Sequence, residues 1–130
     1  REIAMERGIV DAVTDDLRSA TRDADTVALC APVRVILSLV RGRLGAYLRS
    51  NTFVIDIGST KEDICEAMGQ LPIGVQAMGG HPMTGKETSG LEGSDAGLYK
   101  ARPFVLCPTR RTTRIVMTAQ SPRSAIFHIF

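Results

Sequence analysis

Short apolar runs alternate with amphipathic segments along the first 110 residues of the chain. Three runs are apolar at nearly every position, as expected for strands buried on both faces: residues 26–31, 53–57 and 73–78. Between the runs, apolar residues at spacings of three and four predict helices over residues 33–48 and 61–68. A further strand is predicted at residues 103–107. This alternation predicts an α/β fold with a mainly parallel sheet and flanking helices.

The two ends of the chain show weaker patterns. Residues 1–7 predict a helix that Gly8 ends, because glycine readily adopts the left-handed conformation of a helix C-terminus. A turn or helix start is expected near Asp15 and Asp16. Residues 115–117 are compatible with one more strand, and the positions after 120 show no convincing pattern. We therefore expect one domain over residues 1–109 and an unassigned tail over residues 110–130.

Composition excludes several classes of protein. The chain has 130 residues, of which 44% are hydrophobic and 23% charged, as in an ordinary globular domain. A formal net charge of +2 is too small to indicate a nucleic-acid partner. No acidic residue follows Asp95, but the basic residues beyond it lack interleaved aromatics and predict a solvated surface. No apolar run is long enough to span a membrane, so no membrane partner is expected.

The three cysteines are Cys30, Cys65 and Cys107, an odd number at wide spacings. They form no Cys-x-x-Cys pair, so the sequence indicates neither a disulfide framework nor a metal site. Free thiols of this kind are typical of a reducing compartment, and we expect the protein to be cytoplasmic.

Polar residues follow two of the predicted strands. Ser59 and Lys61 come directly after the run 53–57, and His81 follows the run 73–78. Because ligands of open α/β sheets bind outside the carboxyl ends of the strands, these side chains predict one site. Histidine is suited to move a proton near neutral pH. Two simpler interpretations stay open: His81 as a residue of a sharp turn, and Ser59 or Thr60 as the N-cap of the following helix.

Nucleotide-binding motifs are incomplete in this chain. The segment from Gly80 to Lys86 nearly matches the P-loop, but Glu87 stands where a Ser or Thr must bind magnesium, and Pro82 removes a backbone donor. No Gly-x-Gly-x-x-Gly turn lies between a predicted strand and helix. The motifs alone therefore do not indicate a nicotinamide cofactor.

Three segments of the sequence together resemble the prephenate/arogenate dehydrogenase family. They are Ala24-Asp25 leading into the run 27–33, Asp56-Ile57-Gly58-Ser59-Thr60-Lys61, and Gly80-His81-Pro82-Met83-Thr84-Gly85. The resemblance covers about residues 8–108. It implies a partial Rossmann-like dinucleotide-binding domain, with the family's first βαβ part placed before Arg1 and its helical domain after the last residue. This chain departs from the family pattern at Lys86, where a small hydroxyl residue is expected.

The resemblance also implies an activity and roles for individual residues. Family members use NAD or NADP to decarboxylate prephenate or arogenate oxidatively in tyrosine biosynthesis, a branch of aromatic amino acid biosynthesis. By this resemblance His81 accepts the hydroxyl proton and Ser59 aligns the hydroxyl and the histidine. The implied cofactor-binding residues are Ala31, Pro32, Val33 and Gly58, and the implied substrate-binding residues are Ser59, Lys61, His81, Thr84 and Gly85. A full-length enzyme of this family is expected to be a homodimer.

A second hypothesis comes from a different class of function. The chain could be a non-catalytic Rossmann-like fragment, or a remnant that binds a partner protein. Even under the first hypothesis, we expect these 130 residues alone to be inactive.

Overall fold

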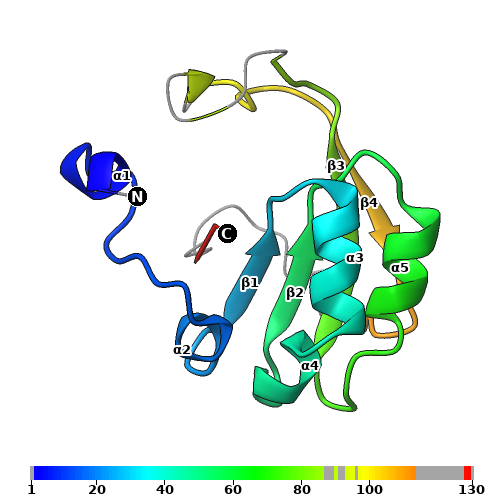
Figure 1. Ribbon diagram of the computed structural model, residues 1–130. Coiled ribbons are helices and arrows are strands. Elements are labelled where there is room, and N and C mark those ends of the chain that lie inside the picture. Colours follow the sequence, from blue (N-terminus) through cyan, green and yellow to red (C-terminus); the bar gives the residue numbers. More distant parts are fainter. Residues whose placement is uncertain (1, 87–89, 91–92, 96, 114–127, 130) are drawn as a thin grey trace.

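The computed structural model describes residues 2–86, 90, 93–95, 97–113 and 128–129. Its centre is a five-stranded sheet in the order β4-β3-β2-β1-β5 (Figure 1). Neighbouring strands are parallel except β3 and β4, which are antiparallel, so the prediction of a mainly parallel α/β sheet is confirmed. The strands are β1 (Thr26–Leu29), β2 (Phe53–Asp56), β3 (Gln76–Pro82), β4 (Phe104–Pro108) and β5 (His128–Ile129).

Three of the five helices in the described part of the chain lie on one face of the sheet (Figure 1). They are α3 (Val33–Arg41), α4 (Leu44–Tyr47) and α5 (Glu62–Met68). The other two, α1 (Glu2–Glu6) and α2 (Leu17–Thr21), precede β1, and α1 lies apart from the sheet. Gly8 has a φ of 62°, as predicted for the residue that ends α1. Asp16 caps α2, because its carboxylate accepts hydrogen bonds from the amides of Arg18 and Ser19.

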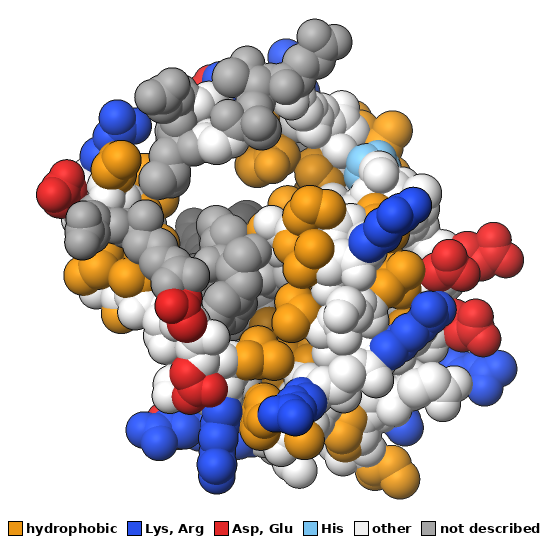
Figure 2. Space-filling model, viewed as in Figure 1, with side chains coloured by type: hydrophobic (Ala, Val, Ile, Leu, Met, Phe, Trp, Pro, Cys, Tyr) orange, Lys and Arg blue, Asp and Glu red, His pale blue; other side chains and the backbone are white. Residues whose placement is uncertain are grey.

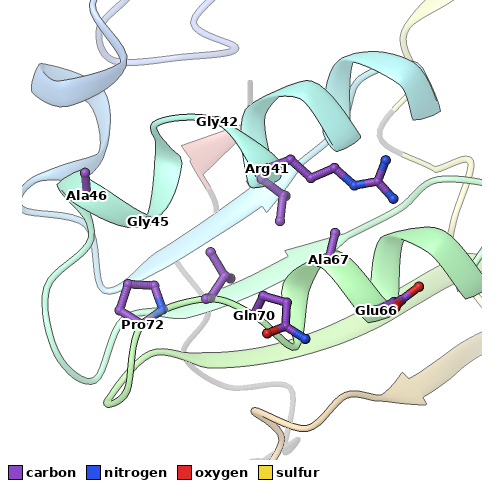
Figure 3. Close-up of a pocket in the computed structure, with 10 residues that line it drawn as sticks. Arg41, Gly42, Gly45, Ala46, Glu66, Ala67, Gln70 and Pro72 are labelled. Carbon is purple, nitrogen blue, oxygen red and sulfur yellow. The ribbon is translucent and has the colours of Figure 1, made fainter.

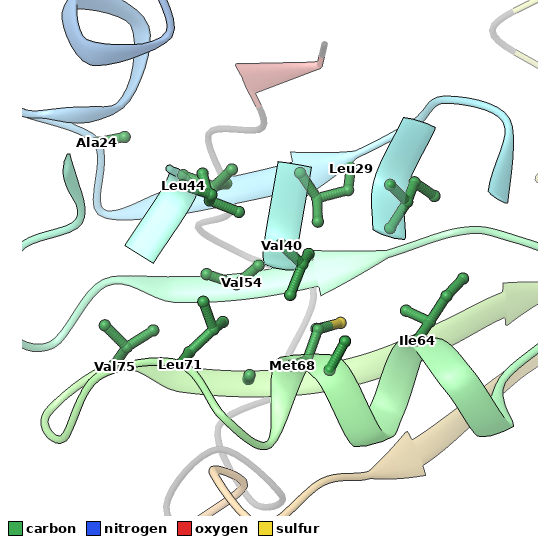
Figure 4. Packing of buried hydrophobic residues seen from close by; sticks show 13 residues of the cluster. Ala24, Leu29, Val40, Leu44, Val54, Ile64, Met68, Leu71 and Val75 are labelled. Carbon is green, nitrogen blue, oxygen red and sulfur yellow. The ribbon is translucent and has the colours of Figure 1, made fainter. Parts of the chain in front are cut away.

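The hydrophobic core fills the space between the sheet and the helices α3, α4 and α5 (Figure 4). Side chains alternate between the two faces of a strand, and each strand contributes those on the face that the helices cover. Each helix contributes the stripe of apolar side chains that faces the sheet. Burying each large side chain contributes about 1.5–3 kcal/mol. Fully or nearly fully buried members of this core are Val27, Leu29, Ile36, Leu44, Val54, Ile64, Met68 and Ala77.

The single helix predicted over residues 33–48 is wrong, because α3 ends at Arg41 and α4 begins at Leu44. Gly42 lies between them with φ −91° and ψ −121°, a non-helical conformation. A Cβ atom at this position would lie 2.7 Å from the Ser38 carbonyl oxygen, so only glycine fits. Glycine also costs about 1 kcal/mol relative to alanine inside a helix, which favours a break here.

The third strand lies further along the chain than predicted. We expected residues 73–78, but β3 begins at Gln76 and ends at Pro82, and Ile73 is 88% exposed. The extension arises from β4, which pairs with it from Met78↔Pro108 to Pro82↔Phe104. This antiparallel partner is distant in sequence, and a local apolar pattern cannot reveal it.

The opposite edge of the sheet is formed by β5. It pairs with β1 at two positions, Val27↔His128 and Ala28↔Ile129. The sequence pattern after residue 120 did not predict this strand, because two residues are too few to produce an alternation. The possible strand at residues 115–117 lies outside the described residues.

Candidate active site

The candidate site begins at the carboxyl end of β2, where the apolar strand ends in Asp56. This side chain is fully buried. Its Oδ2 accepts a hydrogen bond from the Gly58 amide at 2.8 Å, and its Oδ1 accepts one from the Gly80 amide at 3.3 Å. A buried carboxylate requires such partners, because it has lost its hydration. Asp56 therefore connects the loop after β2 to the neighbouring strand β3.

Lys61 completes this connection. Its Nζ forms an ion pair with Asp56 Oδ2 and donates a hydrogen bond to the Gly80 carbonyl oxygen at 2.7 Å. The Lys61 side chain is 17% exposed, so the pair is largely shielded from water. The loop after β2 thus lies against β3 one residue before His81, and the two strand ends meet as the sequence suggested.

His81 lies inside β3, where it pairs in register with Val105 of β4. We expected His81 on a loop or in a sharp turn, and both predictions are wrong. His81 lies in a strand because pairing with β4 extends β3 to Pro82. The ring is partly exposed, and its Nδ1 is buried without a hydrogen-bond partner among the described residues. Within that part of the chain, this ring nitrogen therefore has an unsatisfied hydrogen-bonding capacity.

Ser59 and Thr60 are exposed on the loop between β2 and α5. The helix has Lys61 as its N-cap residue, with no capping bond from a side chain, so the interpretation of Ser59 or Thr60 as the cap is wrong. Both residues lie too early, because the helix begins only at Glu62. Within the described residues, no hydrogen bond joins the Ser59 hydroxyl to the His81 ring.

Thr84 and Gly85 follow the end of β3. Thr84 is partly exposed and Gly85 is exposed. Among the described residues, a Cβ atom on Gly85 would meet no atom within 4 Å. Both residues are therefore accessible to a molecule that lies over the carboxyl end of β3.

The predicted cofactor-binding residues lie at the carboxyl end of β1. Ala31 and Val33 are partly exposed, and Pro32 is exposed as the residue that precedes α3. Gly58 differs from them because it is buried. A Cβ on it would lie 3.0 Å from Ile64 Cδ1 and 3.1 Å from Asp56 Oδ2, so a larger residue here would have to displace these side chains slightly.

The thiols near the site are poor nucleophiles. Burial, together with the nearby charge of Asp56, raises the pKa of Cys30 to about 11. The same two causes raise the pKa of Cys65. Because the thiolate is the reactive form, both thiols stay protonated near neutral pH.

The described part of the chain contains no group of three or more His, Cys, Asp or Glu residues arranged to hold a metal ion. No helix in that same part has the length and apolar character needed to cross a membrane. A cavity of about 500 Å³ lies between α3–α4 and α5, and Arg41, Glu66 and Gln70 are among its lining residues (Figure 3). It is formed by the ends of these helices and lies away from the carboxyl ends of the strands.

Sequence reasoning missed Asp56 and Gly80 as parts of the site. Asp56 carried one detectable signal, an acidic residue at the end of an otherwise apolar strand and five positions before a lysine. Gly80 carried none, because its role depends on a close approach. A Cβ there would lie 2.7 Å from the Asp56 carbonyl oxygen and 2.8 Å from the Phe104 ring.

A mainly parallel sheet with polar groups at its carboxyl edge defines the class of protein, a Rossmann-like nucleotide-binding domain. A family model described as the nucleotide-binding domain of prephenate dehydrogenase matches residues 1–120. The chain belongs to this prephenate dehydrogenase family, as its motifs suggested.

Relatives in the family are known from sequence and from solved structures. The chain is 36% identical over 106 residues to a prephenate dehydrogenase of Lactococcus lactis, covering 80% of this chain and 30% of that protein. It is similar to the crystal structure of Synechocystis arogenate dehydrogenase, with a TM-score of 0.80, 30% identity and 99% of this chain covered. A structure of Aquifex aeolicus prephenate dehydrogenase in complex with hydroxyphenyl propionate and NAD+ gives a TM-score of 0.76, 27% identity and 99% coverage.

The match covers a limited part of each relative. The chain spans 46% of both solved structures and 30% of the Lactococcus lactis protein.

Proposed function

We propose that this chain forms the part of an NAD- or NADP-dependent prephenate or arogenate dehydrogenase that carries the catalytic histidine. One observation carries the proposal. His81 lies at the carboxyl end of β3 in a nucleotide-binding domain, and no described group forms a hydrogen bond with its buried Nδ1. A histidine that positions a fold normally has its ring nitrogens satisfied, whereas a base must keep one free for its substrate.

In the proposed reaction the substrate loses a hydride and carbon dioxide, and its ring becomes aromatic. The His81 imidazole accepts the hydroxyl proton as the carbon–oxygen double bond forms. A bound NAD+ or NADP+ supplies the hydride acceptor. Aromatisation provides the driving force, so the residues of this chain chiefly orient the reacting groups and accept one proton.

The cofactor would lie across the carboxyl end of β1. Ala31, Pro32 and Val33 offer small, uncharged and accessible side chains there, which suits contact with a flat ring. The Ile57 amide donates to the Leu29 carbonyl at 3.2 Å, so the loops after β1 and β2 form one continuous surface. Gly58 would shape this surface from behind through its packing. This arrangement fits a nicotinamide cofactor, and Aquifex aeolicus prephenate dehydrogenase was crystallised with NAD+.

The substrate would lie over the end of β3. Ser59 and Gly85 are exposed and Thr84 is partly exposed, and in this proposal they contact the substrate together with His81. Lys61 already donates to Asp56 and to Gly80, which leaves one of the three ammonium donors for a substrate carboxylate. We further propose that the whole enzyme is a homodimer in the cytoplasm, where its three free thiols would stay reduced.

The test is His81→Asn in the longest natural protein that contains these residues. Asparagine keeps a polar side chain of similar reach but cannot serve as the base. Turnover with prephenate or arogenate should fall by about 10²–10⁴-fold, the usual contribution of general-base catalysis, with the KM for NAD+ or NADP+ little changed. Ser59→Ala should reduce turnover less, because one orienting hydrogen bond contributes about 0.5–1.5 kcal/mol.

Two results would contradict the proposal. Near-normal turnover of His81→Asn would remove the histidine from the chemistry. A parent protein that folds and binds a partner but oxidises neither substrate would favour the non-catalytic fragment.

A further inference from the structure

The end of β3 extends past its neighbour β2. The register places Asp56, the last residue of β2, opposite Gly79, so the segment Gly80-His81-Pro82 has no β2 residue beside it. On its other side this segment is paired with β4, from Gly80↔Leu106 to Pro82↔Phe104. His81 therefore stands on a stretch of strand that is supported by a partner strand on one side.

Side chains replace the absent strand for one residue, Gly80, whose amide and carbonyl belong to two successive peptide groups. The Gly80 amide donates to Asp56 Oδ1 at 3.3 Å, and the Gly80 carbonyl accepts from Lys61 Nζ at 2.7 Å. Gly80 is buried, and buried backbone groups are almost always hydrogen-bonded. The two residues thus satisfy both polar groups of the residue that directly precedes His81.

The Asp56–Lys61 pair is itself held in one geometry. Asp56 is fully buried and also accepts from the Gly58 amide at 2.8 Å, so both carboxylate oxygens are occupied. Absence of a Cβ at Gly80 allows this close approach, because such an atom would lie 2.7 Å from the Asp56 carbonyl oxygen. The pair and Gly80 therefore form a stiff connection across the two strands.

Among the described residues, no hydrogen bond holds the His81 ring in place. Its Nδ1 is buried and unpartnered in that part of the chain. The direction of the ring then depends on the atoms that pack against it and on the backbone that carries it.

We propose that Asp56 and Lys61 are positioning residues for His81. By binding the amide and the carbonyl of Gly80 where a neighbouring strand would otherwise do so, the ion pair fixes the backbone that sets the direction of the His81 side chain. This inference rests on the proposed function for its effect on catalysis, but the geometry that it claims can be measured without any activity.

The first measurement is made on the 130-residue chain itself by NMR of the imidazole nitrogens and their coupled carbon-bound protons. The chain has two histidines, His81 and His128, and a His128→Gln variant assigns the two sets of signals. We expect one sharp set for His81 in the parent chain. In Lys61→Met, which keeps the length of the side chain but removes its donors, the set should shift and broaden or divide.

Arg49→Met is the matched control. Arg49 also donates to one carboxylate and one backbone carbonyl, Asp25 at 3.0 Å and Asp23 at 2.9 Å, but its side chain is 50% exposed. Its removal should leave the His81 signals unchanged. Lys61→Arg retains a cation at the same position and should restore part of the parent spectrum.

The second measurement uses the longest natural protein that contains the segment. Lys61→Met should lower kcat by about 10²-fold, the loss typical of a misplaced catalytic group, while the KM for the nucleotide stays near its parent value. If Lys61→Met does not fold, the double variant Asp56→Asn/Lys61→Met removes both charges and replaces it in both measurements.

Unchanged His81 signals in a folded variant would overturn the proposal whatever the activity. An unfolded double variant would also overturn it, because the pair would then hold the whole domain rather than His81. A third outcome separates the two proposals. If the Lys61 variant alters the His81 signals but His81→Asn keeps its turnover, the positioning role is supported and only the proposed function is refuted.

Discussion

The ends of β2 and β3 differ sharply from the outer edge of β1. At the first region, β2 and β3 pair over four residues, and a buried ion pair binds both the amide and the carbonyl of Gly80. At the second, β5 pairs with β1 at two positions. An apolar cavity of about 250 Å³ lies beside β1, and Val35 on its wall is 46% exposed. On the face of the molecule that Figure 2 shows, a band of hydrophobic side chains runs along the middle.

The difference separates two halves of one proposed active site. The residues around His81 obtain their geometry from contacts within the chain. On the cofactor side, β1 is flanked by the two-residue strand β5 and by the cavity of about 250 Å³, and the chain spans 30% to 46% of the relatives compared above. We infer that the histidine region is preorganised in these residues and that nucleotide affinity depends on more of the protein.

The largest expected effect contrasts a core side chain of the first region with an exposed side chain of the second. Ile64 is fully buried beneath the Asp56 loop, so Ile64→Ala should lower the free energy of unfolding by about 2–5 kcal/mol. Val35→Ala on the exposed side of α3, beside the cavity, should change it by less than about 0.5 kcal/mol. Urea unfolding measures both. A large loss from Val35→Ala would mean that the edge is covered in solution, and the comparison would fail.

A smaller effect is expected from adding one methyl group in the tight region. Gly80→Ala places a Cβ against the Asp56 carbonyl oxygen and the Phe104 ring, and such overpacking costs typically about 1–3 kcal/mol. Gly85→Ala is the control, because its Cβ meets no atom of the described residues within 4 Å. Thermal unfolding of the two variants should separate them clearly. Equal melting temperatures would show that the end of β3 yields easily and does not fix His81.

The sequence predicted the locally determined parts of this molecule. β1, β2 and α5 are short segments whose own apolar pattern decides their structure, and each lies within a few residues of its predicted range. The incorrect or missing predictions concern strands whose pairing partners are distant in the sequence. β3 is extended by β4, which lies over twenty residues further along the chain, and β5 pairs with β1 across about a hundred positions.

The same distinction applies to the candidate site. Ser59, Lys61 and His81 could be selected because polar residues after buried strands are unusual and meet at one edge. The bonds that Lys61 makes to Asp56 and Gly80 could not be predicted, since they depend on the register of β2 and β3. The helix break at Gly42 was likewise hidden, because the apolar spacing continues across it to Leu44.

The smallest expected effect tests the open region directly. Dinucleotides normally rest their pyrophosphate on the amides of a glycine-rich turn at a helix N-terminus, and no Gly-x-Gly-x-x-Gly turn of this kind occurs in these residues. The isolated chain should therefore bind NAD+ or NADP+ with a dissociation constant of about 1 mM or weaker. At about 1 mM nucleotide, the unfolding free energy should then rise by no more than about 0.4 kcal/mol. A micromolar constant would raise it by about 4 kcal/mol under the same conditions, a change that thermal unfolding detects at once. That outcome would place a complete cofactor site within this chain and remove the contrast between its two regions.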